Sequence, residues 1–145
     1  EFFILWNKAT LLFSQRKYNE AIRNLVRLFL NDNYKKADVS LKLKIGVAEC
    51  IMQYESGDTE TALKRVEQVR KKYAMQLAAG DYKRELAVLK LLQRMVEAGE
   101  LEKDKKLMAE IKKFVNASVS DSIEDGEVLR YRAWLAPKVG VTSFA

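Results

Sequence analysis

The 145-residue sequence has no histidine, one cysteine and one proline. A single cysteine excludes an internal disulfide bond, and the lack of histidine removes the side chain on which most zinc sites and most general bases rely. The six glycines are scattered, and none forms a phosphate-binding or dinucleotide-binding loop. We therefore expect no catalytic residue, no metal site and no cofactor in this chain.

The one cysteine, Cys50, lies among apolar residues in a segment with helical periodicity. A thiolate in such surroundings is disfavoured because burial deprives the charged form of its hydration. The chain also has no imidazole that could activate the thiol. We interpret Cys50 as a small core residue, and we expect that this chain is not an enzyme.

Long apolar runs are also lacking. No stretch approaches the roughly 20 residues that cross a bilayer as a helix, so we expect no membrane span. The apolar residues 2–6 are few and follow no basic segment, which indicates the start of a buried helix and not a signal peptide. We expect a cytoplasmic location. The chain begins with Glu1, which leaves open that it is a piece of a longer protein.

The residues that dominate the composition, among them Leu, Ala, Lys, Glu and Arg, favour long helices. Gly57, Gly80 and Gly99 can take the left-handed conformation that ends a helix. Aspartates that could cap the next helix follow the breaks, at Asp38, Asp58, Asp81 and Asp121. These signals predict seven helices, over residues 2–15, 18–30, 38–55, 59–78, 81–98, 101–116 and 122–136. No segment has the alternation typical of a strand.

The predicted helices alternate in character. The second, fourth and sixth carry one apolar stripe on an otherwise charged surface, whereas the first, third and fifth are apolar on nearly every side. A helix that is apolar all round must be covered on more than one side. The sequence therefore predicts a stack of helical hairpins with the odd-numbered helices inside and the even-numbered helices outside.

Three stretches repeat one pattern at nearly constant steps. Superposing Ala21, Ala62 and Asp104 gives steps of 41 and 42 residues, and each stretch opens an amphipathic run. In the first unit Tyr18 precedes Ala21, and the helix before it has Ala9 in a small-residue position. The pattern resembles tetratricopeptide repeats (TPR), although its steps exceed the roughly 34 residues of that family and no proline closes a unit.

The resemblance implies an all-α, α-α superhelix, a TPR-like solenoid of about three helical hairpins plus a C-terminal helix, stacked with a right-handed turn. It would form a single domain over residues 1–137, followed by a C-terminal tail at 138–145. The units would cover about 1–37, 38–79 and 80–120, with the final helix at 121–137.

In TPR-like arrays the partner usually lies along the concave surface of the inner helices. The resemblance thus implies a non-catalytic scaffold or adaptor that presents this groove to a peptide or helix of a protein partner. It places these residues near the groove: Trp6, Phe13, Lys44, Val47, Ile51, Tyr54, Leu89, Gln93 and Tyr131. The same side chains could instead belong to the core, or be covered by the seventh helix or the tail, because aromatic stripes at helical spacing are usually core.

Charge supplies the alternative hypothesis. The chain has 26 basic and 20 acidic residues, a formal net charge of +6, which could favour nucleic acid. Basic residues crowd two outer helices, at Lys64, Arg65, Arg70, Lys71, Lys72, Lys103, Lys105, Lys106, Lys112 and Lys113. Pairs such as Glu60 and Lys64 have the Glu-before-Lys spacing that supports an exposed helix face, which favours a solvated surface over a binding patch. A third possibility is a regulatory appendage of a larger enzyme, and the sequence leaves the oligomeric state open.

Overall fold

The computed structural model describes residues 2–117 and 129–141. Within these ranges the chain is all-α and forms no strand, which confirms the predicted class. The elements in chain order are α1 (Phe2–Ser14), α2 (Tyr18–Phe29), α3 (Asp32–Lys35), α4 (Val39–Glu55), α5 (Thr59–Lys72), α6 (Ala74–Ala78), α7 (Lys83–Ala98), the 3-10 helix η1 (Leu101–Lys103), α8 (Lys105–Ala117), α10 (Tyr131–Leu135) and the 3-10 helix η2 (Ala136–Val139).

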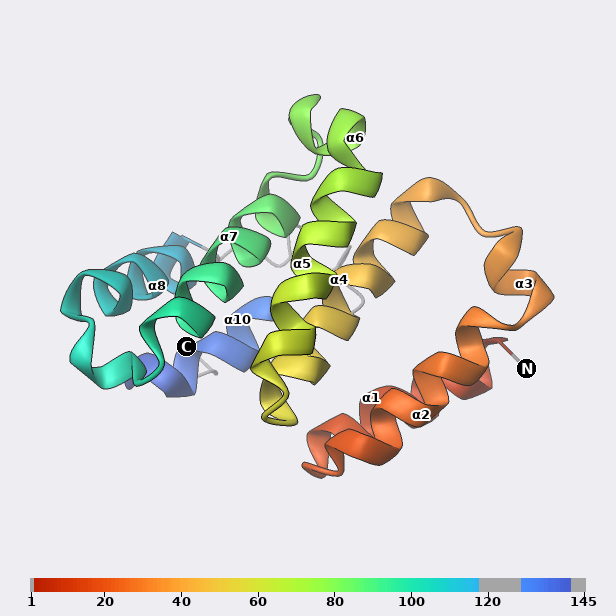
Figure 1. Cartoon of the computed structure of the whole chain (residues 1–145), viewed down its shortest axis with the longest axis horizontal. Coiled ribbons are helices and arrows are strands. Elements are labelled where there is room, and N and C mark those ends of the chain that lie inside the picture. The colour runs from red at the N-terminus through yellow and green to blue at the C-terminus, as the bar shows by residue number, and fades with distance from the viewer. Residues whose placement is uncertain (1, 118–128, 142–145) are drawn as a thin grey trace.

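Successive helices pack as hairpins arranged in a row. Helix α1 packs along α2 and α4 packs along α5, while α2 also contacts α4 and α5 also contacts α7. Helix α8 contacts α7, and the C-terminal elements α10 and η2 pack against α8. Figure 1 shows the row running from α1 and α2 at one end, through α4 and α5, to α7 and α8 at the other.

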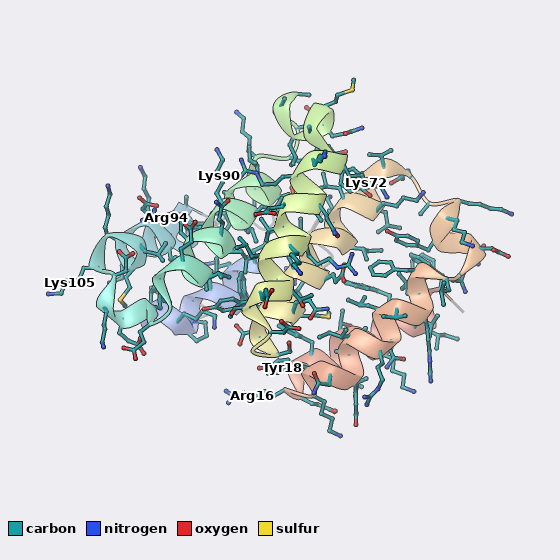
Figure 2. The ribbon with its side chains drawn as sticks, in the orientation of Figure 1. Arg16, Tyr18, Lys72, Lys90, Arg94 and Lys105 are labelled. Carbon is teal, nitrogen blue, oxygen red and sulfur yellow. The ribbon has the colours of Figure 1, made fainter. Side chains whose placement is uncertain are left out.

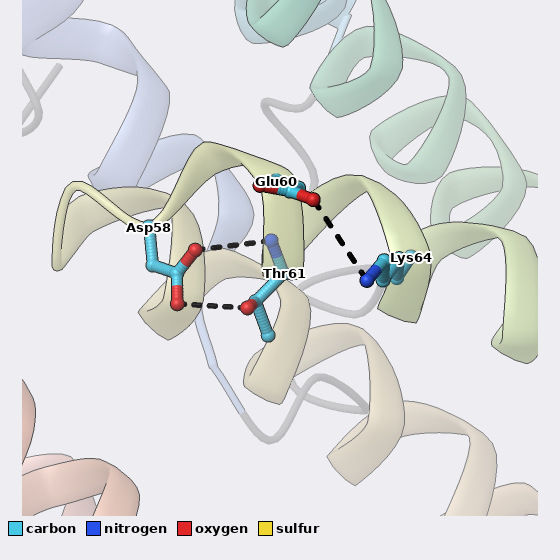
Figure 3. Close-up of polar contacts among 4 residues, drawn as sticks. All are labelled: Asp58, Glu60, Thr61 and Lys64. Atoms are coloured by element: carbon cyan, nitrogen blue, oxygen red, sulfur yellow. Dashed lines mark hydrogen bonds and ion pairs between the residues drawn. The ribbon is translucent and has the colours of Figure 1, made fainter.

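Local sequence signals placed the main helix boundaries correctly. The Asp38 carboxylate accepts a hydrogen bond from the Leu41 N–H at 2.8 Å at the start of α4. Asp58 accepts two bonds from Thr61, from its backbone N–H at 3.1 Å and from its hydroxyl at 2.7 Å, beside the ion pair of Glu60 with Lys64 at 3.8 Å (Figure 3). These bonds to Thr61 lower the pKa of Asp58, because they favour the charged carboxylate. Both aspartates therefore cap helices as predicted.

The glycines also act as predicted. Gly57, Gly80 and Gly99 have positive φ values of 92°, 90° and 71°, which a residue with a Cβ adopts only at a steric cost. Gly57 lies between α4 and α5, Gly80 between α6 and α7, and Gly99 between α7 and η1. The helix predicted from Asp81 instead begins at Lys83, after Tyr82, without a side-chain cap.

Other boundaries differ from the prediction. The helix expected over 59–78 is interrupted at Tyr73 (φ −110°, ψ 28°), where α5 ends and α6 begins. The short helix α3, capped by the side chain of Asn31, forms where a connection was expected. In the helix expected at 122–136, the described part becomes helical at Tyr131, and residues 122–128, with Asp121 before them, lie outside the described residues.

The third repeat unit departs from the predicted register. Asp104 was aligned with Ala21 and Ala62, each the fourth residue of its helix, but α8 begins after Asp104 at Lys105. The Asp104 carboxylate accepts a hydrogen bond from the Leu107 N–H at 3.0 Å, so it acts as a cap and not as a helix-crossing residue. Helix starts at Tyr18, Thr59 and Lys105 give steps of 41 and 46 residues. The nearly constant step was therefore wrong for the last unit.

The core is organised around α4. Every residue from Ile45 to Met52 is buried, which is more than two turns of helix and therefore every side of it. Ile45 and Met52 join a cluster with residues of α1 and α2, while Val47 and Ile51 join a second cluster with residues of α5, α7 and α10. The prediction that this helix is central is confirmed.

A glycine allows α4 and α5 to approach closely. A Cβ atom added to Gly46 would lie 3.2 Å from Cγ2 of Val69 on α5, tighter than nine in ten contacts of real Cβ atoms. The Val69 side chain is itself almost fully buried, with 8% of its surface exposed, so it has little room to move.

We predict that Gly46→Val destabilises the fold by about 1–3 kcal/mol, because the added methyl groups overpack this crossing. Urea denaturation followed by circular dichroism measures the change. Combining it with Val69→Ala should recover part of the loss, since the smaller partner restores space at the crossing. A Gly46→Val variant as stable as the parent would contradict the close approach of the two helices.

Candidate functional site

A groove separates the first helix from the C-terminal helix. It has a volume of about 500 Å³. Helix α1 lines one wall with Trp6, Asn7, Thr10, Phe13 and Ser14, and the opposite wall consists of Leu129, Arg130, Ala133 and Trp134. The aromatic side chains Trp6, Phe13 and Trp134 are all partly exposed, so the groove offers apolar surface with polar groups at its edge.

Two of the predicted site residues, Trp6 and Phe13, lie in this groove. Phe13 also packs against both central clusters, which fixes its position between the first hairpin and the C-terminal segment. The Thr10 hydroxyl donates a hydrogen bond to the backbone carbonyl of Asn7 at 3.0 Å, so this hydroxyl has its partner within the helix. The other residues of the α1 wall are three or four positions from Thr10 in the chain, so they lie on one face of this helix.

Four other predicted site residues do not face a partner. Val47, Ile51, Leu89 and Tyr131 are all 0% exposed and belong to one buried cluster. Leu129 and Trp134 pack against the same cluster, so the C-terminal segment at residues 129–141 helps to cover the inner surface that the sequence assigned to a partner. We therefore correct the prediction for these four residues, which are core residues.

Hydrogen bonds and ion pairs fix the C-terminal segment to the inner helices. At the end of α4, one carboxylate oxygen of Glu55 accepts from Trp134 Nε1 at 2.8 Å and lies 2.6 Å from Lys138 Nζ. The Tyr131 hydroxyl donates to the buried Glu85 carboxylate on α7 at 3.0 Å. Two carboxylates on two inner helices therefore hold the segment in place, together with its apolar contacts.

Tyr54 and the two polar candidates have different surroundings. The Lys138 ammonium lies 5.7 Å from the centre of the partly exposed Tyr54 ring, and burial raises the pKa of this tyrosine. Gln93 accepts a hydrogen bond from Arg70 of α5 at 3.1 Å, which places it at the α5–α7 contact and outside the groove. Lys44 is partly exposed on α4 and is not among the residues that line the groove.

The sequence did not reveal the second wall of the groove. Trp134 is one of two tryptophans in the chain, but local periodicity did not indicate that it would face α1. Arg130 and Ala133 had no distinguishing signal at all. The groove depends on how the C-terminal segment packs over distant helices, which local periodicity does not determine.

Cys50, the one cysteine of the chain, lies in the core. Cys50 is fully buried, and burial raises the pKa of its thiol, so it is held as an unreactive neutral group. No group of three or more Cys, Asp or Glu side chains is placed to hold a metal ion in the described ranges. In the same ranges no helix is both long and apolar enough to cross a membrane.

Comparisons with known proteins add no assignment. No family model matched the chain, and neither the curated proteins nor the solved structures gave a significant match.

Proposed function

We propose that this chain is a TPR-like superhelix that acts as a non-catalytic protein-interaction module, and that it binds an apolar peptide segment of a protein partner in the groove between α1 and α10. The observation that carries the proposal is the groove itself, in which three partly exposed aromatic side chains face a space of about 500 Å³. Aromatic anchors of this kind supply much of the binding free energy in protein interfaces.

Small residues support the TPR-like arrangement. Ala9, Ala21, Cys50 and Ala62 are all 0% exposed, as expected for positions where helices cross closely. These four residues include the positions that carried the resemblance in the first two units. The third unit has a different register, so the proposal rests mainly on the first two hairpins and the C-terminal segment.

The chain would act by presenting a preformed, rigid groove to its partner. Both walls of the groove are fixed before the partner arrives, by the packing of α1 on α2 and by the bonds of the C-terminal segment to Glu55 and Glu85. A preformed groove lowers the ordering cost of binding. Trp6 and Trp134 would take an apolar side chain of the peptide, and Arg130 at the edge would favour an acidic residue beside it.

We predict that Thr10→Arg weakens partner binding at least about tenfold without changing the melting temperature, because a long charged side chain fills the groove from an existing helix surface. Recovery of each protein from cell extract on the immobilised parent and variant gives the comparison. Gln15→Arg is the matched control, since it adds the same charge at an exposed position that follows Ser14 in the chain and does not line the groove. Equal recovery of every bound protein on Thr10→Arg and on the parent would refute the groove.

Nucleic-acid binding stands as a second candidate because exposed cations occur on successive helices. Lys72 of α5, Lys90 of α7 and Lys105 of α8 are exposed, and Figure 2 shows them across this part of the row. Helix α7 contacts both α5 and α8, so the two basic outer helices flank it. Part of the charge is compensated, since Arg94 of α7 pairs with Glu110 of α8 and Arg65 pairs with Glu49.

The second candidate predicts an affinity for RNA or DNA oligonucleotides that falls steeply with salt, and a loss of at least about tenfold in the double variant Lys71→Glu/Lys72→Glu. Fluorescence anisotropy over a salt series measures both effects. The control Lys35→Glu/Lys36→Glu changes the net charge by the same amount at the C-terminal end of α3. Affinity that is indifferent to salt and to the α5 substitutions would remove this candidate.

A further inference from the structure

A second pocket lies between the first hairpin (α1 and α2) with α3 and the second hairpin (α4 and α5). It shares no lining residue with the groove. It has a volume of about 300 Å³, at the lower end of the usual range for small-molecule sites of about 300–1,000 Å³. The first hairpin and α3 contribute Phe29 and Tyr34. The second hairpin contributes the remaining lining residues, Lys42, Gly46, Glu49, Arg65, Gln68, Val69, Lys72 and Tyr73.

Three cations surround this pocket, and Arg65 is the best positioned of them. Its Nε lies 3.1 Å from a carboxylate oxygen of Glu49, and its Nη1 donates to the side-chain oxygen of Gln68 at 2.8 Å. These contacts use two of the five N–H donors of a guanidinium and fix its orientation. Arg65 is therefore held in place by the protein before any ligand binds.

Two lysines flank the opening from different helices. Lys42 on α4 donates to the Lys35 carbonyl at 2.8 Å, and its ammonium lies 5.8 Å from the centre of the Tyr34 ring. Lys72 at the end of α5 lies 5.6 Å from the centre of the Tyr73 ring. Each ammonium carries three donors, so both keep hydrogen-bonding capacity for an anion.

The only carboxylate among the lining residues is Glu49, which is 7% exposed and already paired with Arg65. Three cations against one carboxylate leave the lining with an excess of positive charge. A tyrosine hydroxyl is protonated at neutral pH, and burial raises the pKa of Tyr34 further, to about 12. A hydrogen-bond donor thus stands beside the cations, which suits an anionic group.

Aromatic rings make up much of the remaining lining, beside Val69 and Gln68. Phe29, Tyr34 and Tyr73 contribute rings, and Gly46 contributes a surface without a side chain. The ring centres of Phe29 and Tyr34 are 5.1 Å apart in an edge arrangement, so this wall is itself packed. A planar group could lie against these rings while its charged end meets the cations.

We propose that this pocket binds a small phosphorylated molecule with a planar apolar body, with Arg65 as the anchor of the phosphate, Lys42 and Lys72 as flanking cations and the aromatic wall as the contact for the ring. A phosphate suits this lining because it offers several acceptor oxygens to donors that come from different helices. The site is independent of the peptide groove.

Isothermal titration with phenyl phosphate, adenosine monophosphate and inorganic phosphate tests the proposal on the whole chain. We expect the two ring-bearing compounds to bind more tightly than inorganic phosphate, and phenol to bind far more weakly than phenyl phosphate. Lys42→Gln/Lys72→Gln should weaken binding of phenyl phosphate at least about tenfold, since two charge-assisted contacts are lost.

Lys64→Gln/Lys71→Gln is the matched control, because both lysines lie on α5 outside the lining and the same charge is removed. This control should bind phenyl phosphate within about twofold of the parent, since exposed charges that are distant from a ligand are screened by salt. The proposal is overturned if none of the three phosphates binds at concentrations up to about 10 mM. It is also overturned if the pocket variant binds as the control does, or if inorganic phosphate binds as tightly as phenyl phosphate.

Discussion

The need to cover α4 on every side governs the rest of the structure. From Ile45 to Met52 every residue of α4 is buried, and the hydrophobic effect favours removing each apolar side of this stretch from water. Helices α1 and α2 enclose the side with Ile45 and Met52, while α5, α7 and the C-terminal segment enclose the side with Val47 and Ile51. The row of hairpins is the consequence of this single central helix.

The C-terminal segment completes the cover of the buried cluster around α4, and it also provides partners for the carboxylates of Glu55 and Glu85. A carboxylate that is taken out of water is costly unless it gains partners. Glu85 is 5% exposed and accepts from Tyr131, and Glu55 receives both the Trp134 indole and the Lys138 ammonium. The segment therefore fixes its own position by polar contacts, and its residues Leu129, Arg130, Ala133 and Trp134 form the wall of the groove that faces α1.

The sequence predicted most of the fold because the relevant signals are local. Asp38 and Asp58 cap helices, and Gly57 and Gly99 end them, through bonds and dihedral angles that involve only a few neighbouring residues. The interruption at Tyr73 carries no Gly or Pro signal and was missed. The candidate site was only partly predictable, since Trp6 was found by its pattern but its opposite wall depends on long-range packing.

The docking of the C-terminal segment on Glu55 is the central claim, and amide hydrogen exchange of a Glu55→Ala variant tests it most directly. Losing charged hydrogen bonds worth about 1.5 kcal/mol or more should raise exchange in α10, at amides such as that of Trp134, about tenfold or more. Amides of α1 and α2 should be unchanged, and Glu60→Ala, which removes an exposed ion pair, should have no such effect. Unchanged exchange in α10 of Glu55→Ala would contradict the account.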